Sequence, residues 1–130
     1  MNLVSPHAPP RRDAFPALRG ARILAIPSAF TTATGRDHWE VLLRARAIEN
    51  QVFVVAPNQI GAAPPHFNSF GHSAIVDPWG VVLAVAPDEE CFVAAELDLR
   101  VQDSVRASLP SLANRRPGAY VWPQLSEARA

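Results

Sequence analysis

Few side chains in this sequence could form or break a covalent bond, and Cys91 is the first of them. The chain of 130 residues has one cysteine and four histidines, and all twelve basic residues are arginine. A catalytic thiol needs a proton acceptor beside it and a positive donor at the charge that develops on the substrate. Cys91 instead opens the apolar run CFVAAEL, which is typical of a strand. We therefore interpret it as a structural thiol and predict no catalytic residue here; chemistry that pairs Cys91 with a histidine is the alternative.

The acidic and histidine side chains also lack the spacing of a reactive site. Glu40 and Glu49 lie nine residues apart on one predicted helix, so they point in different directions and are better explained as solvated or interface charges. The histidines show neither an i, i+4 pair nor a neighbouring Cys-x-x-Cys sequence, which zinc sites typically have. The four residues concerned are His7, His38, His66 and His72. We predict no metal site and no cofactor.

The stretch at residues 27–50, a predicted strand end followed by a loop and a helix, is expected to position the residues of any pocket. The apolar run at 22–26 ends at a proline, which has no backbone donor. Ser28, Ala29 and Phe30 are therefore expected at the carboxyl tip of a strand.

An amphipathic helix is predicted directly after this tip. Thr34 stands three residues before Asp37, a pairing that can cap a first turn, so the helix is expected to begin near Gly35. From Trp39 to Ile48 the apolar residues recur at steps of three and four. That period indicates a helix packed on a sheet.

The remaining pattern predicts an α/β fold. The apolar run at 52–56 indicates a buried strand, parallel to the first because a helix connects them. The sequence Asp-Pro-Trp-Gly at 77–80 predicts a hairpin turn, and Asp98 can cap a last helix. The full predicted order is strand, helix, strand, a long loop at 58–71, a β-meander of strands at 72–76, 81–85 and 91–97, and a helix at 98–106 that Pro110 ends.

Composition limits the class of protein. Twelve basic and twelve acidic residues cancel, which argues against a nucleic-acid or anionic-membrane surface. No run approaches the roughly 20 apolar residues of a membrane span, and a single cysteine with no signal-like start indicates a cytoplasmic location. We divide the chain into a disordered leader at 1–18, a folded domain at 19–110 and an irregular tail at 111–130.

Several sequence words carry a resemblance to a known family. GARILAIPSAFT, TGRDHWEVLLRARAIENQVFVVAPNQIG, FGHSAIVDPWGVVLA and AELDL, followed by RRP, occur in this order between residues 20 and 117. They resemble the carboxyl-terminal half of the nitrilase superfamily of carbon–nitrogen hydrolases. The resemblance is greatest to its amidases of deaminated glutathione and similar ω-amides.

The resemblance implies a partial α-β-β-α sandwich of the nitrilase type. It also implies that Ser28, Ala29 and Phe30 lie against bound substrate, with the segment at 58–70 over the pocket mouth. The helix at 36–50 resembles one at the family's dimer interface, although a helix that only packs on a sheet is compatible with the same pattern. The residues expected at that interface are Trp39, Leu43, Arg46 and Glu49.

The resemblance also implies a catalytic Cys-Glu-Lys triad that this sequence does not contain. The chain has no lysine, and the position of the family's catalytic cysteine reads RRDAFPALRGA. We therefore expect a truncated hydrolase, a pseudoenzyme when alone, that acts on a small amide only if the missing half completes it. The alternative is a non-catalytic binding or regulatory subunit that docks on a full-length homologue. Because half a sandwich leaves a sheet face uncovered, we expect a homo-oligomer or such an association.

Overall fold

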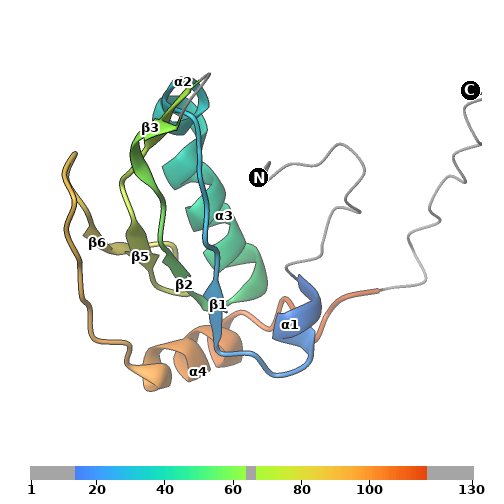
Figure 1. Ribbon diagram of the computed structural model, residues 1–130. Coiled ribbons are helices and arrows are strands. Elements are labelled where there is room, and N and C mark those ends of the chain that lie inside the picture. The colour runs from blue at the N-terminus through green and yellow to red at the C-terminus, as the bar shows by residue number, and fades with distance from the viewer. Residues whose placement is uncertain (1–13, 64–66, 117–130) are drawn as a thin grey trace, which may run out of the picture.

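The computed structural model describes residues 14–63 and 67–116, in which a helix covers one face of a four-stranded sheet (Figure 1). The sheet has the order β1-β2-β5-β6, formed by Ile23–Ala25, Phe53–Ala56, Ala74–Val76 and Val82–Val85. A separate ribbon consists of β3 (Ile60–Ala63) and β4 (Phe67–Phe70). The helices are α1 (Ala14–Leu18), α2 (Thr32–Thr34), α3 (Glu40–Asn50) and α4 (Leu99–Ser108), with a π-helical turn, η1, at Gly35–Trp39. The predicted mixed α/β fold is confirmed.

Strands β1 and β2 are parallel, and α3 connects them. Their register pairs Ile23 with Phe53 and Ala25 with Val55. Gln51 ends α3 in a left-handed backbone conformation, with φ of 51°, and so turns the chain into β2. Parallel neighbours need such a long crossover, and the predicted strand–helix–strand unit is therefore confirmed.

Strands β5 and β6 form the predicted hairpin around Asp77. The Asp77 carbonyl accepts a hydrogen bond from the Gly80 amide at 3.0 Å. Oδ1 of the Asp77 side chain accepts hydrogen bonds from the amides of Trp79 at 2.9 Å and Val81 at 2.8 Å. Gly80 has a positive φ of 89°, and a side chain there would lie 2.6 Å from Cδ1 of Ile48. The hairpin turn therefore packs closely against α3.

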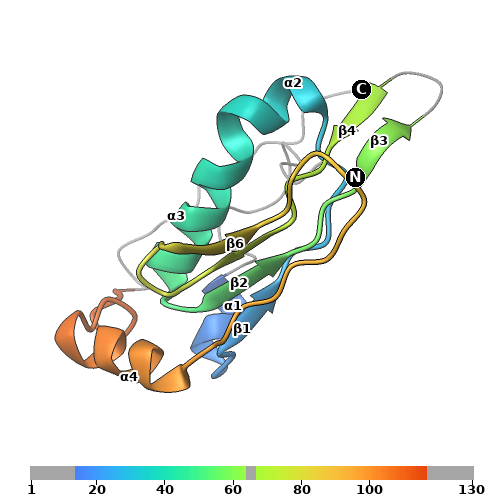
Figure 2. The same ribbon diagram turned by 90° about the vertical axis from the view of Figure 1, so that its left-hand side faces the viewer.

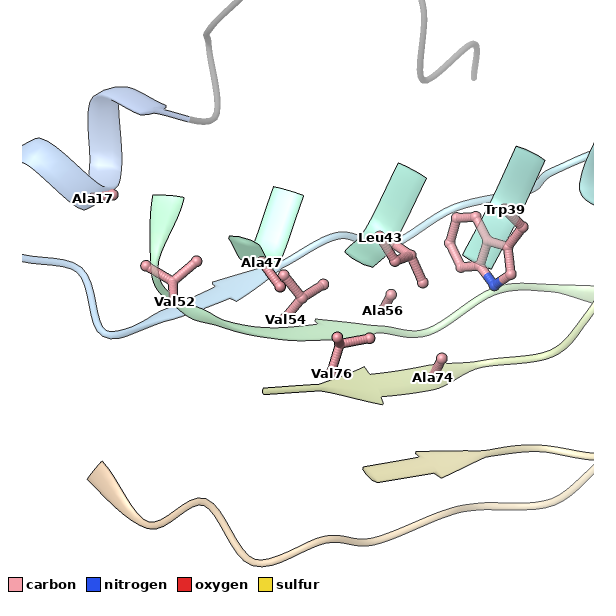
Figure 3. Close-up of a cluster of buried hydrophobic side chains, with 9 residues drawn as sticks. All are labelled: Ala17, Trp39, Leu43, Ala47, Val52, Val54, Ala56, Ala74 and Val76. Carbon is pink, nitrogen blue, oxygen red and sulfur yellow. The ribbon is translucent and has the colours of Figure 1, made fainter. Parts of the chain in front are cut away.

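The main hydrophobic core lies between α3 and the sheet (Figure 3). Trp39, Leu43 and Ala47 point from the helical segment toward the strands and are buried. The buried cluster consists of Ala17, Trp39, Leu43, Ala47, Val52, Val54, Ala56, Ala74 and Val76. Because side chains of a strand alternate between faces, Phe53 and Ile75, which are also buried, belong to the opposite face.

The helix begins earlier than predicted. Helical structure starts with α2 at Thr32, and the Thr34 side chain caps no turn. The Thr34 hydroxyl instead lies 2.8 Å from that of Thr31. The predicted start near Gly35 is wrong because this glycine sits inside the helical run, under the ring of Phe70.

The predicted long loop at 58–71 is largely a β-ribbon. Its strands pair Ile60 with Phe70 and Ala62 with Asn68. An antiparallel bridge between Thr31 and Ser69 joins the ribbon to the chain that follows β1. Glycine and proline conceal the alternating pattern of these strands, and their pairing depends on contacts outside the segment.

The predicted third strand of the meander, at 91–97, is not formed. Within the described part of the chain, no backbone hydrogen bond joins this segment to a strand. It runs along the side of the sheet away from α3 and leads into α4 (Figures 1 and 2). The predicted cap of that helix is confirmed, since Oδ1 of Asp98 accepts the Arg100 amide at 2.9 Å. Helix α4 ends at Ser108, shortly before Pro110.

Helix α4 is fixed to the sheet by polar side chains. The amide of Gln102, which is fully buried, donates to the carbonyls of Arg22 at 3.1 Å and Gln51 at 2.7 Å. Arg22 also pairs with Asp103 at 2.7 Å. These contacts join α4 to the start of β1 and the end of α3.

Part of the predicted leader is ordered. Residues Ala14–Leu18 form α1, and Ala17 is buried in the core cluster. The rest of the leader, at 1–13, and the tail at 117–130 lie outside the described residues. Among the described helices, none has the length and apolar character to cross a membrane.

Candidate functional site

The candidate site lies at the carboxyl ends of β1 and β2, where each strand reaches a proline. Pairing continues past Pro27 and Pro57, because the Ser28 amide donates to the Pro57 carbonyl at 2.9 Å and the Gln59 amide donates to the Ser28 carbonyl at 3.0 Å. Ser28 and Asn58 thereby form a parallel bridge beyond the strands. The two strand tips present one continuous surface.

A pocket of about 460 Å³ opens at these tips. The structure places Ser28 and Ala29 in its wall, and their predicted contact with substrate stays a prediction. Phe30 is not among the lining residues; its ring lies 5.3 Å from that of Trp39, at the margin of the core. The lining residues are Pro27, Ser28, Ala29, Pro57, Asn58 and Gln59.

Asn58 organises this site, although the sequence predicts it only as the first residue of a loop. Its Oδ1 accepts the Phe30 amide at 3.0 Å, and its Nδ2 donates to the Gly71 carbonyl at 2.6 Å. The Asn58 amide also donates to Oγ of Ser73 at 2.9 Å. The buried Asn58 side chain thus joins the tip of β1 to the end of the ribbon, and the Asn58 backbone joins both to the start of β5. The only signal in the sequence was an asparagine directly after a strand-ending proline.

A second pocket, of about 470 Å³, lies between the ribbon and the segment after β6. Asn58 and Gln59 belong to both pockets. His72 stacks on Phe70 with ring centroids 4.2 Å apart, and its Nδ1 lies 3.0 Å from the Phe70 carbonyl and 3.4 Å from Oδ1 of Asp88. The lining residues are Asn58, Gln59, Ile60, Ala62, Ser69, Gly71, His72, Ser73, Ala86, Pro87, Glu89, Glu90 and Cys91.

The pocket at the strand tips offers no acid or base. None of its lining residues carries an ionisable side chain. Cys91 is exposed at the second pocket, and Glu40 and Glu49 pair with arginines on the helix surface. Within the described residues, no group of three potential ligands could hold a metal ion.

The residues predicted at a dimer interface divide between two faces of α3 and the turn before it. Trp39 and Leu43 are each only 2% exposed and face the sheet within this chain. The Trp39 indole also donates to the His72 carbonyl at 2.7 Å. Arg46 and Glu49 form an ion pair on the solvent side. The interface therefore stays a prediction, and solvent reaches only the second pair.

Comparisons of the sequence with known proteins identify a family and its members. The family described as carbon-nitrogen hydrolase matches residues 13–107. The nitrilase and fragile histidine triad fusion protein NitFhit of Caenorhabditis elegans is 51% identical over 102 residues, which are 78% of this chain and 23% of that protein. Deaminated glutathione amidase of Homo sapiens is 48% identical over 104 residues, 80% of this chain and 32% of that protein.

A solved structure shows the same likeness in three dimensions. The crystal structure of the C. elegans NitFhit protein superposes with a TM-score of 0.79 at 48% identity, and the match covers 84% of this chain and 26% of that one. The chain thus spans about a quarter to a third of the length of these relatives. The resemblance and fold class expected from the sequence words are confirmed.

Proposed function

Because this chain belongs to the carbon–nitrogen hydrolase family, we propose that it forms the carboxyl-terminal part of an amidase for small ω-amides of the deaminated-glutathione type. The family match over residues 13–107 supports the reaction class. The identity of 48% to a deaminated glutathione amidase supports the substrate class. The observation that carries the proposal is the pocket at the tips of β1 and β2, in the stretch with the family's sequence words.

In this proposal the chain supplies a binding wall rather than the reacting groups. Amide hydrolysis through an acyl-enzyme needs a nucleophile, a proton acceptor and a positive donor at the oxyanion. The chain contains no lysine, and its one cysteine lines the other pocket. Ser28 and Ala29 would lie against the amide, and hydrolysis would require groups that this chain does not contain. An exposed thiol at Cys91 fits a reducing, cytoplasmic compartment.

The test is a titration of the chain with glutaramate, a small ω-amide, followed by ¹H–¹⁵N NMR. We expect chemical-shift changes at Ser28, Ala29 and Gln59, and no release of ammonia from the amide. The Cys91→Ala variant is the matched control, and it should bind equally well. Unchanged chemical shifts at the strand tips would contradict the proposed binding wall. Ammonia release by the wild type that Cys91→Ala abolishes would contradict the proposal that this chain contains no reacting group.

A second candidate function is a non-catalytic subunit that docks on a full-length homologue. Large exposed apolar side chains favour it: Val81, directly before β6, is 51% exposed, Val85, in β6, is 52% exposed, and Phe92 is 90% exposed. Large exposed apolar side chains can contribute to a binding face. The test mixes the chain with a full-length deaminated glutathione amidase in size-exclusion chromatography. Separate elution of the two proteins would exclude this function.

A further inference from the structure

Asn58 stands where the regular pairing between β1 and β2 ends. Along the two strand tips, alternate amides of the first strand donate to alternate carbonyls of the second. The last bond in this direction joins the Ser28 amide to the Pro57 carbonyl at 2.9 Å. The next amide in this series belongs to Phe30, and its regular acceptor would be the carbonyl of Gln59.

That regular acceptor already has another donor. The Gly71 amide donates to the Gln59 carbonyl at 2.8 Å, which closes the base of the β3–β4 ribbon. Oδ1 of Asn58 accepts the Phe30 amide in its place, while Nδ2 holds the Gly71 carbonyl. Asn58 is only 8% exposed, so water does not readily replace it. One side chain therefore fixes the point at which the strand tip and the ribbon separate.

We propose that Asn58 is a positioning residue for the amide-binding wall, a role that rests on the proposed function. The wall runs from Ser28 to Phe30, and in the described part of the chain the backbone groups of Ala29 make no hydrogen bond. Its conformation is set by the bonds at its two ends. At the Phe30 end the Phe70 amide donates to the Phe30 carbonyl at 2.7 Å, and Asn58 supplies the acceptor for the Phe30 amide. Loss of the Asn58 bond releases that amide, which belongs to the peptide bond that follows Ala29.

The first measurement is amide hydrogen exchange of the chain without ligand, in the wild type, Asn58→Ala and Asn50→Ala. Asn50 is the matched control, since it is 1% exposed and bonds the Arg46 carbonyl at 2.9 Å, but lines neither pocket. A lost hydrogen bond of ordinary strength corresponds to roughly a tenfold change in an opening equilibrium. We expect the Phe30 amide to exchange about tenfold faster in Asn58→Ala than in Asn50→Ala. Equal exchange in the two variants would overturn the proposal.

A second variant keeps the test decisive if Asn58→Ala does not fold. Asn58→Asp retains an acceptor for the Phe30 amide, but its second oxygen would face and repel the Gly71 carbonyl, which Nδ2 of Asn58 contacts at 2.6 Å. The Gly71 amide should therefore exchange faster, whereas protection of the Phe30 amide should stay near that of the wild type. Rapid exchange of Phe30 in a folded Asn58→Asp chain would show that the side-chain acceptor does not hold the wall.

The third measurement separates this proposal from the function on which it rests. Glutaramate should bind the wild type and Asn50→Ala alike, and bind Asn58→Ala about tenfold more weakly, as for one lost positioning bond. If the wild type does not bind glutaramate, the proposed substrate class fails, and the exchange data alone decide the role of Asn58. If Asn58→Ala binds as tightly as Asn50→Ala, the positioning role is wrong.

Discussion

At the scale of the single residue, Gly35 shows how a distant contact can override a local preference. Its φ of −61° and ψ of −45° are helical, and a helical position is normally more stable with alanine than with glycine. A Cβ atom there, however, would lie 2.2 Å from Cγ of Phe70. The ribbon and the helical segment therefore approach each other so closely that only glycine fits.

We expect Gly35→Ala to lower the free energy of unfolding by about 1–3 kcal/mol, the usual penalty for overpacking. Chemical denaturation followed by circular dichroism measures the change. The same substitution in a Phe70→Ala background should be neutral or stabilise by up to about 1 kcal/mol, because only the helix preference remains. Equal destabilisation in both backgrounds would mean that the clash with Phe70 is not the cause.

The site residues show what the sequence could predict at this scale. Ser28 and Ala29 lie directly after a short strand, as the apolar run and the proline before them indicated, and their contact with substrate stays a prediction. Phe30 was expected beside substrate, but its ring lies against Trp39, and no local pattern reports that contact. Asn58 was missed as an organising residue because its partners lie 28 and 13 residues away in the chain.

At the scale of the element, α4 begins at an acidic cap that should respond to pH. The Arg100 side chain, and then its amide, hydrogen-bond to Asp98 and lower the pKa of that carboxyl group. Because the pKa of Asp98 is lower in the folded state, the ionised carboxylate stabilises the fold, and this stabilisation is complete above the ordinary aspartate pKa of about 3.9. It is lost as the pH falls through the lower, folded-state value.

We therefore expect the wild type to lose stability on acidification relative to Asp98→Asn. Asparagine can cap the helix but does not titrate, so it serves as the matched control. Thermal unfolding of both chains between about pH 6 and pH 3 measures the difference across the relevant range. A difference in melting temperature that stays constant over this range would contradict a titrating cap.

The elements differ in how far local sequence determines them. The hairpin around Asp77 was predictable because its turn bonds lie within a few residues. The ribbon at 58–71 was not, since it pairs through a bridge to Thr31 and packs on Gly35. The segment at 91–97 has the composition of a strand, but among the described residues no strand pairs with it, and composition alone does not determine pairing.

At the scale of the whole molecule, the two faces of the sheet are covered unequally. Helix α3 closes one face over the core, while a single extended segment passes along the other (Figure 2). Strand β6 is an edge, and no described strand pairs with its outer side. Its Leu83 and Val85 are 39% and 52% exposed. Exposed apolar edges of this kind favour association between chains.

This asymmetry predicts a concentration-dependent self-association that β6, rather than α3, controls. Val85→Lys places a charge on the open edge and should shift the sedimentation profile toward the monomer, because a lysine there must be desolvated for a second chain to pair. Val41→Lys is the matched control, since Val41 is 65% exposed on the outer side of α3. If Val41→Lys dissociates the assembly and Val85→Lys does not, the helix carries the interface, as the family resemblance implies, and the edge of the sheet serves another purpose.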